Sequence, residues 1–382
     1  MKTIYLDNAA TTKVDDNVVK EIEVYLTDKY GNASSTHAKG REARYALDYA
    51  RDVIAKSIGA KPEEIVFTSG GTESNNFALK AVAFANRERG KHIITTKIEH
   101  DCVLNACKWL EKQGFKVTYV DVDKEGFVKP EVLEKAITKN TIIASIIHGN
   151  NEIGTIQDLK KLGEICRKHK VYLHTDACQS YTKTELNVKK QNVDLVTLNA
   201  HKIHGPKGVG ALYIRTGVKI EAWQHGGGHE FKLRSGTENV PGIMGFARAV
   251  KNASSGDMKR IVKLRDKLIE GVLMIPGTML NGPRGEKRLC NNTNFSFKYV
   301  EGEAIGGYLD AKGVCSSTGS ACSSKSLEPS HVLMALGLKV EDAHGSLRLS
   351  LSKYTTDEEL DYVLEILPKI IESLRKISPF SK

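Results

Sequence analysis

The chain has 382 residues, a formal net charge of +10, 40% apolar residues and seven cysteines. The length predicts about two domains, because one domain mostly holds ~100–200 residues, and the composition is that of a soluble globular protein. The odd cysteine count argues against a disulfide framework, and no apolar run resembles a signal peptide or the ~20 residues of a membrane span. We therefore expect a cytoplasmic protein with reduced thiols.

From about residue 16 to 255, short apolar runs alternate with helix-like stretches. This alternation is typical of an α/β domain with a mostly parallel sheet. The predicted strands are Ile65–Phe67, His92–Ile94, Val117–Val120, Thr141–Ile147, Val171–Leu173, Val193–Leu198 and Gly210–Ile214. The predicted helices between them include Asn75–Arg89, Val103–Gln113 and Leu159–Lys170. The last two strands are an exception, since a loop of about a dozen residues separates them and leaves no room for a helix.

A polar, turn-rich segment, Asn252–Asp257, predicts a domain boundary. Beyond it the pattern favours a smaller α+β domain. Its predicted elements are a helix over Met258–Met274, strands at Asn294–Phe297 and Leu347–Ser350, and a helix near Thr356–Ile377. We predict a large domain over residues 16–255 and a small domain built from residues 1–15 and 256–382.

A positive net charge, here +10, can indicate a nucleic-acid-binding protein. Here the lysines are scattered, and the densest cluster, Arg167–Lys170, has the pattern of a solvated helix end. We expect no direct nucleic-acid binding.

One candidate site is Thr68–Glu73, a Thr-Ser-Gly-Gly-Thr-Glu segment that follows a strand and opens a helix. Its glycines allow close backbone approach, and free N–H groups at a helix start favour an anion. An ordinary N-capped turn explains the same residues.

Asp176 and Lys202 form a second candidate pair. Asp176 ends an apolar strand, where ligands sit in α/β sheets, and its carboxylate can hold a pyridinium nitrogen protonated. Lys202 lies in the loop between the two strands that lack a helix, and a lysine there can form a Schiff base. These two groups are what pyridoxal phosphate requires. The alternatives are a capping aspartate and a surface lysine.

Three further residues are candidates for chemistry. His100 can stack on a flat ring or move protons, or it can be structural. Cys322 lies in a Ser/Thr/Gly-rich stretch that cannot pack a core, which favours a reactive thiol over a chance exposed one. Arg348 sits inside a short apolar strand, either to bind a substrate carboxylate or at an edge-strand surface.

These segments together resemble the NifS/IscS-type cysteine desulfurases along nearly the whole chain. The motifs that carry the resemblance are YLDNAATT (Tyr5–Thr12), TSGGTESNN (Thr68–Asn76), EHDCVL (Glu99–Leu104), HGNNEIG (His148–Gly154), HTDACQS (His174–Ser180), HKIHGPKGVGALYIR (His201–Arg215), HGGGHE (His225–Glu230), RSGTENV (Arg234–Val240), SSTGSACSSKSLEPSHVL (Ser316–Leu333) and SLRLSL (Ser346–Leu351).

The resemblance implies a homodimer with the fold type I of pyridoxal-phosphate-dependent transferases, a class V aminotransferase-like α/β fold. It also implies the role of each site residue. Lys202 would bind the cofactor as a Schiff base, Asp176 would pair with the ring nitrogen, and His100 would stack on the ring. Ring and phosphate contacts would come from Asn151, Gln179, Gly71, Thr72, Asn199, His201 and, from the other subunit, Thr237. Arg348 and Asn151 would hold the substrate carboxylate, and Cys322 would be the nucleophile.

Asn199 stands where the family usually has a serine, and because an amide is longer than a hydroxyl we expect weaker phosphate anchoring. The implied activity converts L-cysteine to L-alanine and a Cys322 persulfide. The sulfur would pass to an iron–sulfur scaffold or another acceptor protein. No resident metal is expected, although Cys322 could be a transient iron–sulfur ligand. A selenocysteine lyase, a generic aminotransferase and an inactive scaffold for iron–sulfur assembly are the alternatives.

Overall fold

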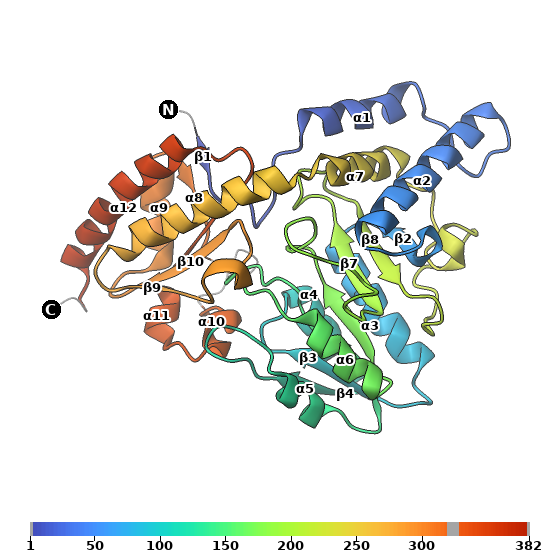
Figure 1. Cartoon of the computed structure of the whole chain (residues 1–382), viewed down its shortest axis with the longest axis horizontal. Coiled ribbons are helices and arrows are strands. Elements are labelled where there is room, and N and C mark those ends of the chain that lie inside the picture. Colours follow the sequence, from blue (N-terminus) through green and yellow to red (C-terminus); the bar gives the residue numbers. More distant parts are fainter. Residues whose placement is uncertain (1–2, 319–327, 380–382) are drawn as a thin grey trace.

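Seven strands form the central sheet of the larger lobe in the computed structural model, which describes residues 3–318 and 328–379 (Figure 1). In spatial order they are β2 (Ile65–Thr68), β8 (Gly210–Ile214), β7 (Leu195–Asn199), β6 (Tyr172–Asp176), β5 (Thr141–Ser145), β3 (His92–Thr96) and β4 (Lys116–Val120). Each overlaps a predicted strand, which confirms the predicted mixed, mostly parallel sheet. Such strands are continuous apolar runs because helices cover both faces of the sheet.

Strand β8 is antiparallel to both of its neighbours, β2 and β7. Only residues 200–209 connect β7 to β8, and a parallel crossover needs a dozen or more residues. This short connection carries Lys202.

The larger lobe also contains seven α-helices among the described residues. They are α1 (Asp16–Thr27), α2 (Ala38–Ser57), α3 (Gly71–Ala85), α4 (Asp101–Lys112), α5 (Pro130–Ala136), α6 (Leu159–Lys168) and α7 (Val240–Asn252). Helices α3 and α4 build the core on one face of the sheet, and the other α-helices build the core on the opposite face. Three of these helices were predicted at α3, α4 and α6, and the other four were missed.

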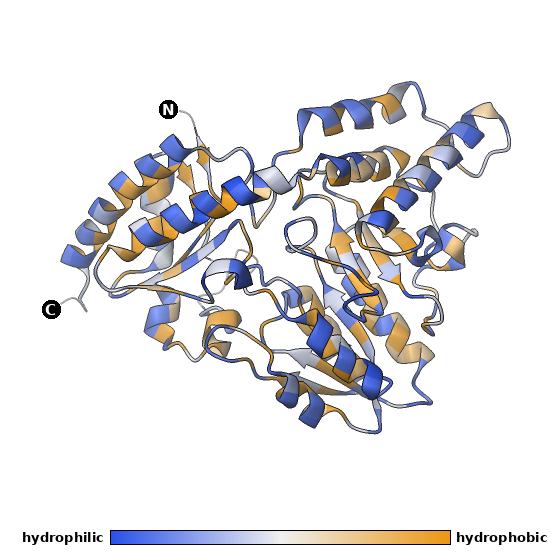
Figure 2. Ribbon diagram, viewed as in Figure 1, coloured by the Kyte–Doolittle hydropathy of each residue, from blue (hydrophilic) through white to orange (hydrophobic). Residues whose placement is uncertain are grey.

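The smaller lobe has a three-stranded antiparallel sheet in the order β12-β10-β9, covered by α8 and α12. Its elements are β1 (Ile4–Tyr5), α8 (Ser255–Leu273), β9 (Thr278–Leu280), β10 (Asn292–Phe297), α9 (Gly302–Asp310), β11 (Val314–Cys315), α10 (His331–Ala335), α11 (Val340–His344), β12 (Ser346–Ser350) and α12 (Asp357–Ile377). Short 3₁₀ turns occur at Pro62–Glu64, Glu230–Lys232 and Gly285–Lys287. Figure 2 shows α8 and α12 with one polar and one apolar side, as expected for helices that cover a core.

Between α7 and α8 the chain leaves helical structure only at Ala253 and Ser254, and the Ser254 hydroxyl caps α8. The predicted polar linker is therefore a short break between consecutive helices. The domain limits at residues 16 and 255 stay a prediction.

The N-terminal segment joins the two lobes. Strand β1 pairs with β11 in the smaller lobe, and Asp7 bridges to Ser350. The chain then enters the larger lobe, where the Ala10 carbonyl contacts Lys202. Backbone groups far from Lys202 in sequence thereby become its neighbours.

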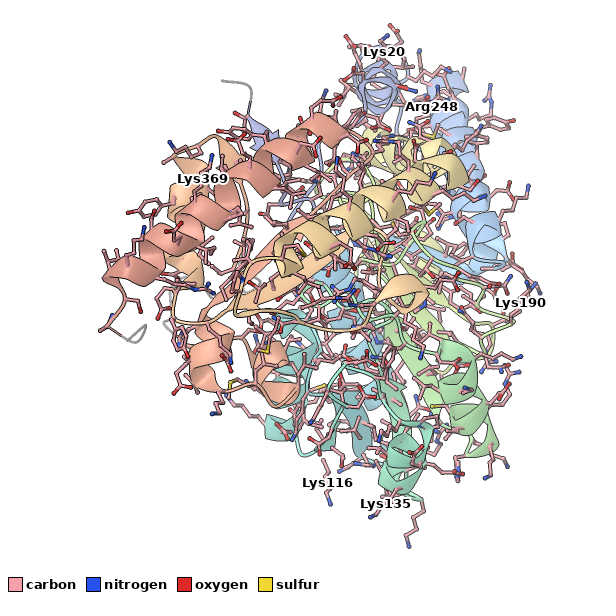
Figure 3. All side chains as sticks on the ribbon, turned by 60° about the vertical axis from the view of Figure 1, so that its left-hand side comes forward. Lys20, Lys116, Lys135, Lys190, Arg248 and Lys369 are labelled. Carbon is pink, nitrogen blue, oxygen red and sulfur yellow. The ribbon has the colours of Figure 1, made fainter. Side chains whose placement is uncertain are left out.

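Positive charge is distributed around the molecule. The cationic side chains labelled in Figure 3, on separate elements, are Lys20, Lys116, Lys135, Lys190, Arg248 and Lys369. Among the described helices, none is both long and apolar enough to cross a membrane.

Candidate active site

A cavity of about 350 Å³ lies at the carboxyl ends of β6 and β7. Ala9 and Ala10 of the N-terminal segment and Arg348 of β12 also line it. The predicted residues that line it are Gly71, Thr72, His100, Asn151, Asp176, Gln179, Asn199, His201, Lys202 and Arg348. Thr237 is exposed and does not line this cavity. Cys322 lies outside the described residues.

Asp176 is the last residue of the buried strand β6, and its side chain has two fixed donors. The Asn75 amide donates to Oδ2 at 2.7 Å, and the backbone N–H of Cys178 donates to Oδ1 at 2.8 Å. One carboxylate oxygen therefore caps the following turn, and the residue also lines the cavity. The capping alternative is confirmed, and pairing with a ring nitrogen stays a prediction for the same side chain.

Lys202 lies in the loop between β7 and β8, and its ammonium donates to the carbonyls of Ala9 and Ala10. Burial, together with the nearby charge of Arg348, lowers the pKa of Lys202 to about 8. An amine must be unprotonated to attack a carbonyl, so this environment increases the reactive fraction near neutral pH. Lys202 is thus not a surface lysine.

The start of α3 forms an anion cradle. A Cβ on Gly71 would lie 2.6 Å from Cys178 Sγ, so any larger residue here would displace the Cys178 side chain. Asn199 Nδ2 lies 3.7 Å from the same point, which directs an amide donor toward the helix start. Burial lowers the pKa of the nearby His201 to about 4, so its ring is neutral. Free helix N–H groups with amide and imidazole groups beside them fit a phosphate.

Three buried side-chain amide oxygens of cavity-lining residues, Asn75 Oδ1, Asn151 Oδ1 and Asn199 Oδ1, have no hydrogen-bond partner within the described part of the chain. Buried polar atoms are normally satisfied, so these atoms fit a site that holds a polar ligand. Together with the cradle and Asp176, the donor set fits pyridoxal phosphate.

His100 is the N-cap of α4. Its Nδ1 accepts the backbone N–H of Cys102 at 3.2 Å, so in the neutral ring the proton belongs on Nε2. The imidazole thus has a fixed orientation at the cavity wall and a donor on its other nitrogen.

Arg348 is almost fully buried in β12, with 2% of its surface exposed. Nη1 donates to the Asn151 carbonyl at 3.0 Å, and Nη2 contacts Asp7 Oδ1 at 3.0 Å. The alternative of a surface arginine is wrong, because β12 is an edge strand whose outer side is covered by the N-terminal segment.

Sequence reasoning missed several cavity residues, although each lies in or beside a quoted motif. They are Asn75, Glu99, Cys102, Glu152, Cys178 and His331. Burial raises the pKa of Glu99 to about 8, so its side chain is a neutral acid at pH 7. Its backbone carbonyl accepts a hydrogen bond from His331 Nε2 at 2.9 Å, which attaches α10 to the cavity wall.

The two cavity thiols are poor nucleophiles. Burial raises the pKa of Cys102 to about 12 and that of Cys178 well above its ordinary value, with the Asp176 charge as the next cause in both. The thiolate is the reactive form of cysteine, so both are inert near neutral pH. Among the described residues, no group of three or more His, Cys, Asp or Glu side chains could hold a metal ion.

Comparison with known proteins identifies the family of the chain. Residues 4–363 match the aminotransferase class-V family. The chain is 52% identical to the cysteine desulfurase IscS of Methanosarcina thermophila over 100% of this chain and 95% of the relative. It is 53% identical to the cysteine desulfurase IscS of Dictyoglomus turgidum over 100% and 98%.

Solved structures give the same result. A NifS-like protein superposes with a TM-score of 0.92 at 43% identity, covering 97% of this chain and all of the other. The structure of SspA in complex with cysteine superposes with a TM-score of 0.84 at 37% identity, covering 93% and 100%. The chain therefore belongs to the aminotransferase class-V family and, within it, to the pyridoxal-phosphate-dependent cysteine desulfurases of the NifS/IscS type.

Proposed function

We propose that this enzyme takes the sulfur of L-cysteine, releases L-alanine and retains the sulfur as a persulfide on Cys322. The observation that carries the proposal is that Lys202, Asp176 and Arg348 line a single cavity. They provide an amine, a carboxylate and a guanidinium, which are the groups needed to bind pyridoxal phosphate and an amino-acid substrate.

The cofactor would lie between β6, β7 and α4. Asp176 would pair with the ring nitrogen, His100 would stack on the ring, and Gln179 and Asn151 would contact the ring oxygen. Pyridoxal phosphate, when bound, supplies an electron sink for the substrate's Cα electrons. The phosphate would occupy the anion cradle, where its donors would be Gly71, Thr72, Asn199 and His201 and, from the partner subunit, Thr237.

Arg348 would bind the substrate carboxylate. A guanidinium offers two parallel N–H groups that match a carboxylate. In this structure Arg348 contacts Asp7 and the Asn151 carbonyl, so its fork is already oriented at the cavity. The structure of SspA in complex with cysteine supports the same substrate for this chain.

Lys202 would carry protons to and from the substrate carbons, since its lowered pKa allows it to act as both base and acid near neutral pH. The Cys322 thiolate would attack the substrate sulfur. An S–S bond forms, the Cβ–S bond breaks, and the former sulfur-bearing carbon takes up a proton, so that cysteine and one thiol give alanine and one persulfide.

Cys322 is the preferred nucleophile because the described cysteines are poorly suited to the reaction. Burial raises the thiol pKa of Cys102, Cys107, Cys166, Cys178, Cys290 and Cys315. The resemblance of the sequence around Cys322 to NifS/IscS-type proteins is the positive argument.

We further propose a homodimer, a sulfur-acceptor protein such as an iron–sulfur scaffold, and a cytoplasmic location. The exposed Thr237 and the resemblance support the dimer. The six described cysteines are free thiols, which supports a reducing compartment, because disulfides persist mainly in oxidising ones.

The test is incubation of the purified protein, loaded with pyridoxal phosphate, with L-cysteine and a reducing thiol, followed by measurement of sulfide and alanine. Equal amounts of the two products are expected, and none from Lys202→Ala. Borohydride reduction should place the cofactor on Lys202. A label on Lys207 or Lys183 would contradict the site, and turnover of selenocysteine alone would indicate a selenocysteine lyase.

A further inference from the structure

We propose that Thr12 is a positioning residue for Lys202, and that its hydroxyl closes the turn that presents the lysine amine to the cavity. This inference rests on the proposed function, in which Lys202 binds the cofactor. Thr12 does not line the cavity and would not touch cofactor or substrate.

The hydroxyl of Thr12 joins both ends of the turn that contains Lys202. It donates to the His201 carbonyl at 2.8 Å and accepts the backbone N–H of His204 at 2.9 Å. The backbone N–H of Thr12 also donates to the His201 carbonyl, at 3.0 Å. Only 5% of Thr12 is exposed, so water does not replace these bonds if they are lost.

The same N-terminal segment holds the amine itself. Lys202 Nζ donates to the carbonyls of Ala9 and Ala10, which precede Thr12 by a few residues. Gln179 Nε2 donates to the Ala9 carbonyl at 2.8 Å. A shift of the Lys202 turn relative to the N-terminal segment would therefore change both the position of Nζ and the hydrogen bonds that the Ala9 and Ala10 carbonyls accept from it.

Asp15 fixes the other end of the segment. Its backbone N–H donates to the His204 carbonyl at 3.1 Å. Its carboxylate accepts from Tyr354 Oη at 2.6 Å and pairs with Lys353, both from the smaller lobe. The segment from Ala9 to Asp15 thus connects the Lys202 turn to the smaller lobe, and Thr12 is the side chain on which the turn closes.

The variant that tests this is Thr12→Val, which keeps the shape and removes the hydroxyl, with Thr12→Ser as the conservative rescue. A matched control is Thr141→Val, because Thr141 is also buried and its hydroxyl also accepts a backbone N–H, from Thr138 at 2.8 Å, at the opposite end of β5 from the cavity. Leaving the His204 N–H unsatisfied should misplace Lys202 and lower kcat about tenfold.

The KM for cysteine should change less than about twofold, because Arg348 and not Lys202 binds the carboxylate. Bound cofactor should be lost on dialysis about tenfold faster in Thr12→Val. Thr12→Ser and Thr141→Val should keep the wild-type kcat and cofactor retention. Wild-type kcat in Thr12→Val, or equal impairment in Thr12→Ser, would overturn the proposal.

If Thr12→Val does not fold, hydrogen exchange of the wild-type holoenzyme decides. The backbone N–H of His204 should exchange as slowly as those of β7. Fast exchange of this N–H in the folded enzyme would show that the Thr12 hydroxyl does not hold the turn, and would overturn the proposal. Failure of the proposed function is distinguishable, since borohydride labelling would then fall on another residue in the wild type, whatever the Thr12 variants do.

Discussion

Replacing Asn199 by alanine should weaken cofactor binding, because it removes the amide donor directed at the anion cradle. Asn199 is 3% exposed, and its Nδ2 lies 3.7 Å from the point where a Cβ of Gly71 would stand, beside the first N–H groups of α3. One hydrogen bond to a charged group is worth roughly 1.5–3 kcal/mol. The dissociation constant for pyridoxal phosphate should therefore rise about 10- to 150-fold.

The sequence alone predicted that Asn199 anchors phosphate less well than serine. The closeness of Nδ2 to the start of α3 favours the opposite expectation, that the amide already supplies the donor, so Asn199→Ser should bind the cofactor no more tightly than the wild type. Tighter binding by Asn199→Ser would restore the original prediction.

The assay is titration of the apo-protein with pyridoxal phosphate, followed by protein fluorescence, together with retention on dialysis. Asn86→Ala is the control, because Asn86 is also a buried amide but lies at the far end of α3 and bonds Val82 and Lys219 carbonyls. It should lose stability and keep its affinity. If Asn199→Ala binds the cofactor like the wild type, Asn199 does not hold the phosphate.

Arg348→Lys should raise the KM for cysteine about 10- to 150-fold with kcat changed less than about threefold, because one charge-assisted bond of the fork is lost; an unchanged KM in steady-state sulfide assays would exclude the assigned role. Glu99 has a folded pKa of about 8, above its ordinary 4.5, so the folded state keeps a proton that the unfolded state loses in this window. The unfolding free energy of the wild type, compared with that of Glu99→Gln, should thus fall from pH 5 to pH 8 by up to about 1.4 kcal/mol per pH unit. Denaturant titrations in which the unfolding free energies of the two proteins change equally with pH would reject this. Glu230→Ala should cost about 3–5 kcal/mol of unfolding free energy, because Glu230 forms a buried two-point pair with Arg51, with both distances 2.7 Å. Glu365→Ala, which breaks an exposed helical pair, should cost about 0.5 kcal/mol or less in the same titration, and similar losses in the two variants would contradict the argument.

The central sheet was predictable because its strands, except the half-buried edge strand β4, are buried on both faces and so appear as largely apolar runs. Helices α1 and α2 were missed because many of their side chains are polar or exposed, including Tyr45 at 77%. Helix α3 begins at Gly71, four residues earlier than predicted, because a glycine-rich cradle has a loop-like sequence even where its backbone is already helical.

Asp176 and Lys202 were predictable as site residues because Asp176 ends one buried strand and Lys202 follows another, and the ends of these strands share one edge of the sheet. The carbonyls of Ala9 and Ala10 were not, because backbone groups have no sequence signal and lie about 190 residues from Lys202 along the chain. The raised pKa of Glu99 was not predictable from the sequence either, since it arises from burial by atoms of several elements.

The most direct test of the account is a single turnover of the holoenzyme with L-cysteine, followed by peptide mass spectrometry without reductant. The account predicts one added sulfur atom on the peptide that contains Cys322, with one alanine released per sulfur retained. Cys322→Ser should bind cofactor and cysteine but retain no sulfur. A persulfide on Cys315, or sulfide release that survives in Cys322→Ser, would contradict the account.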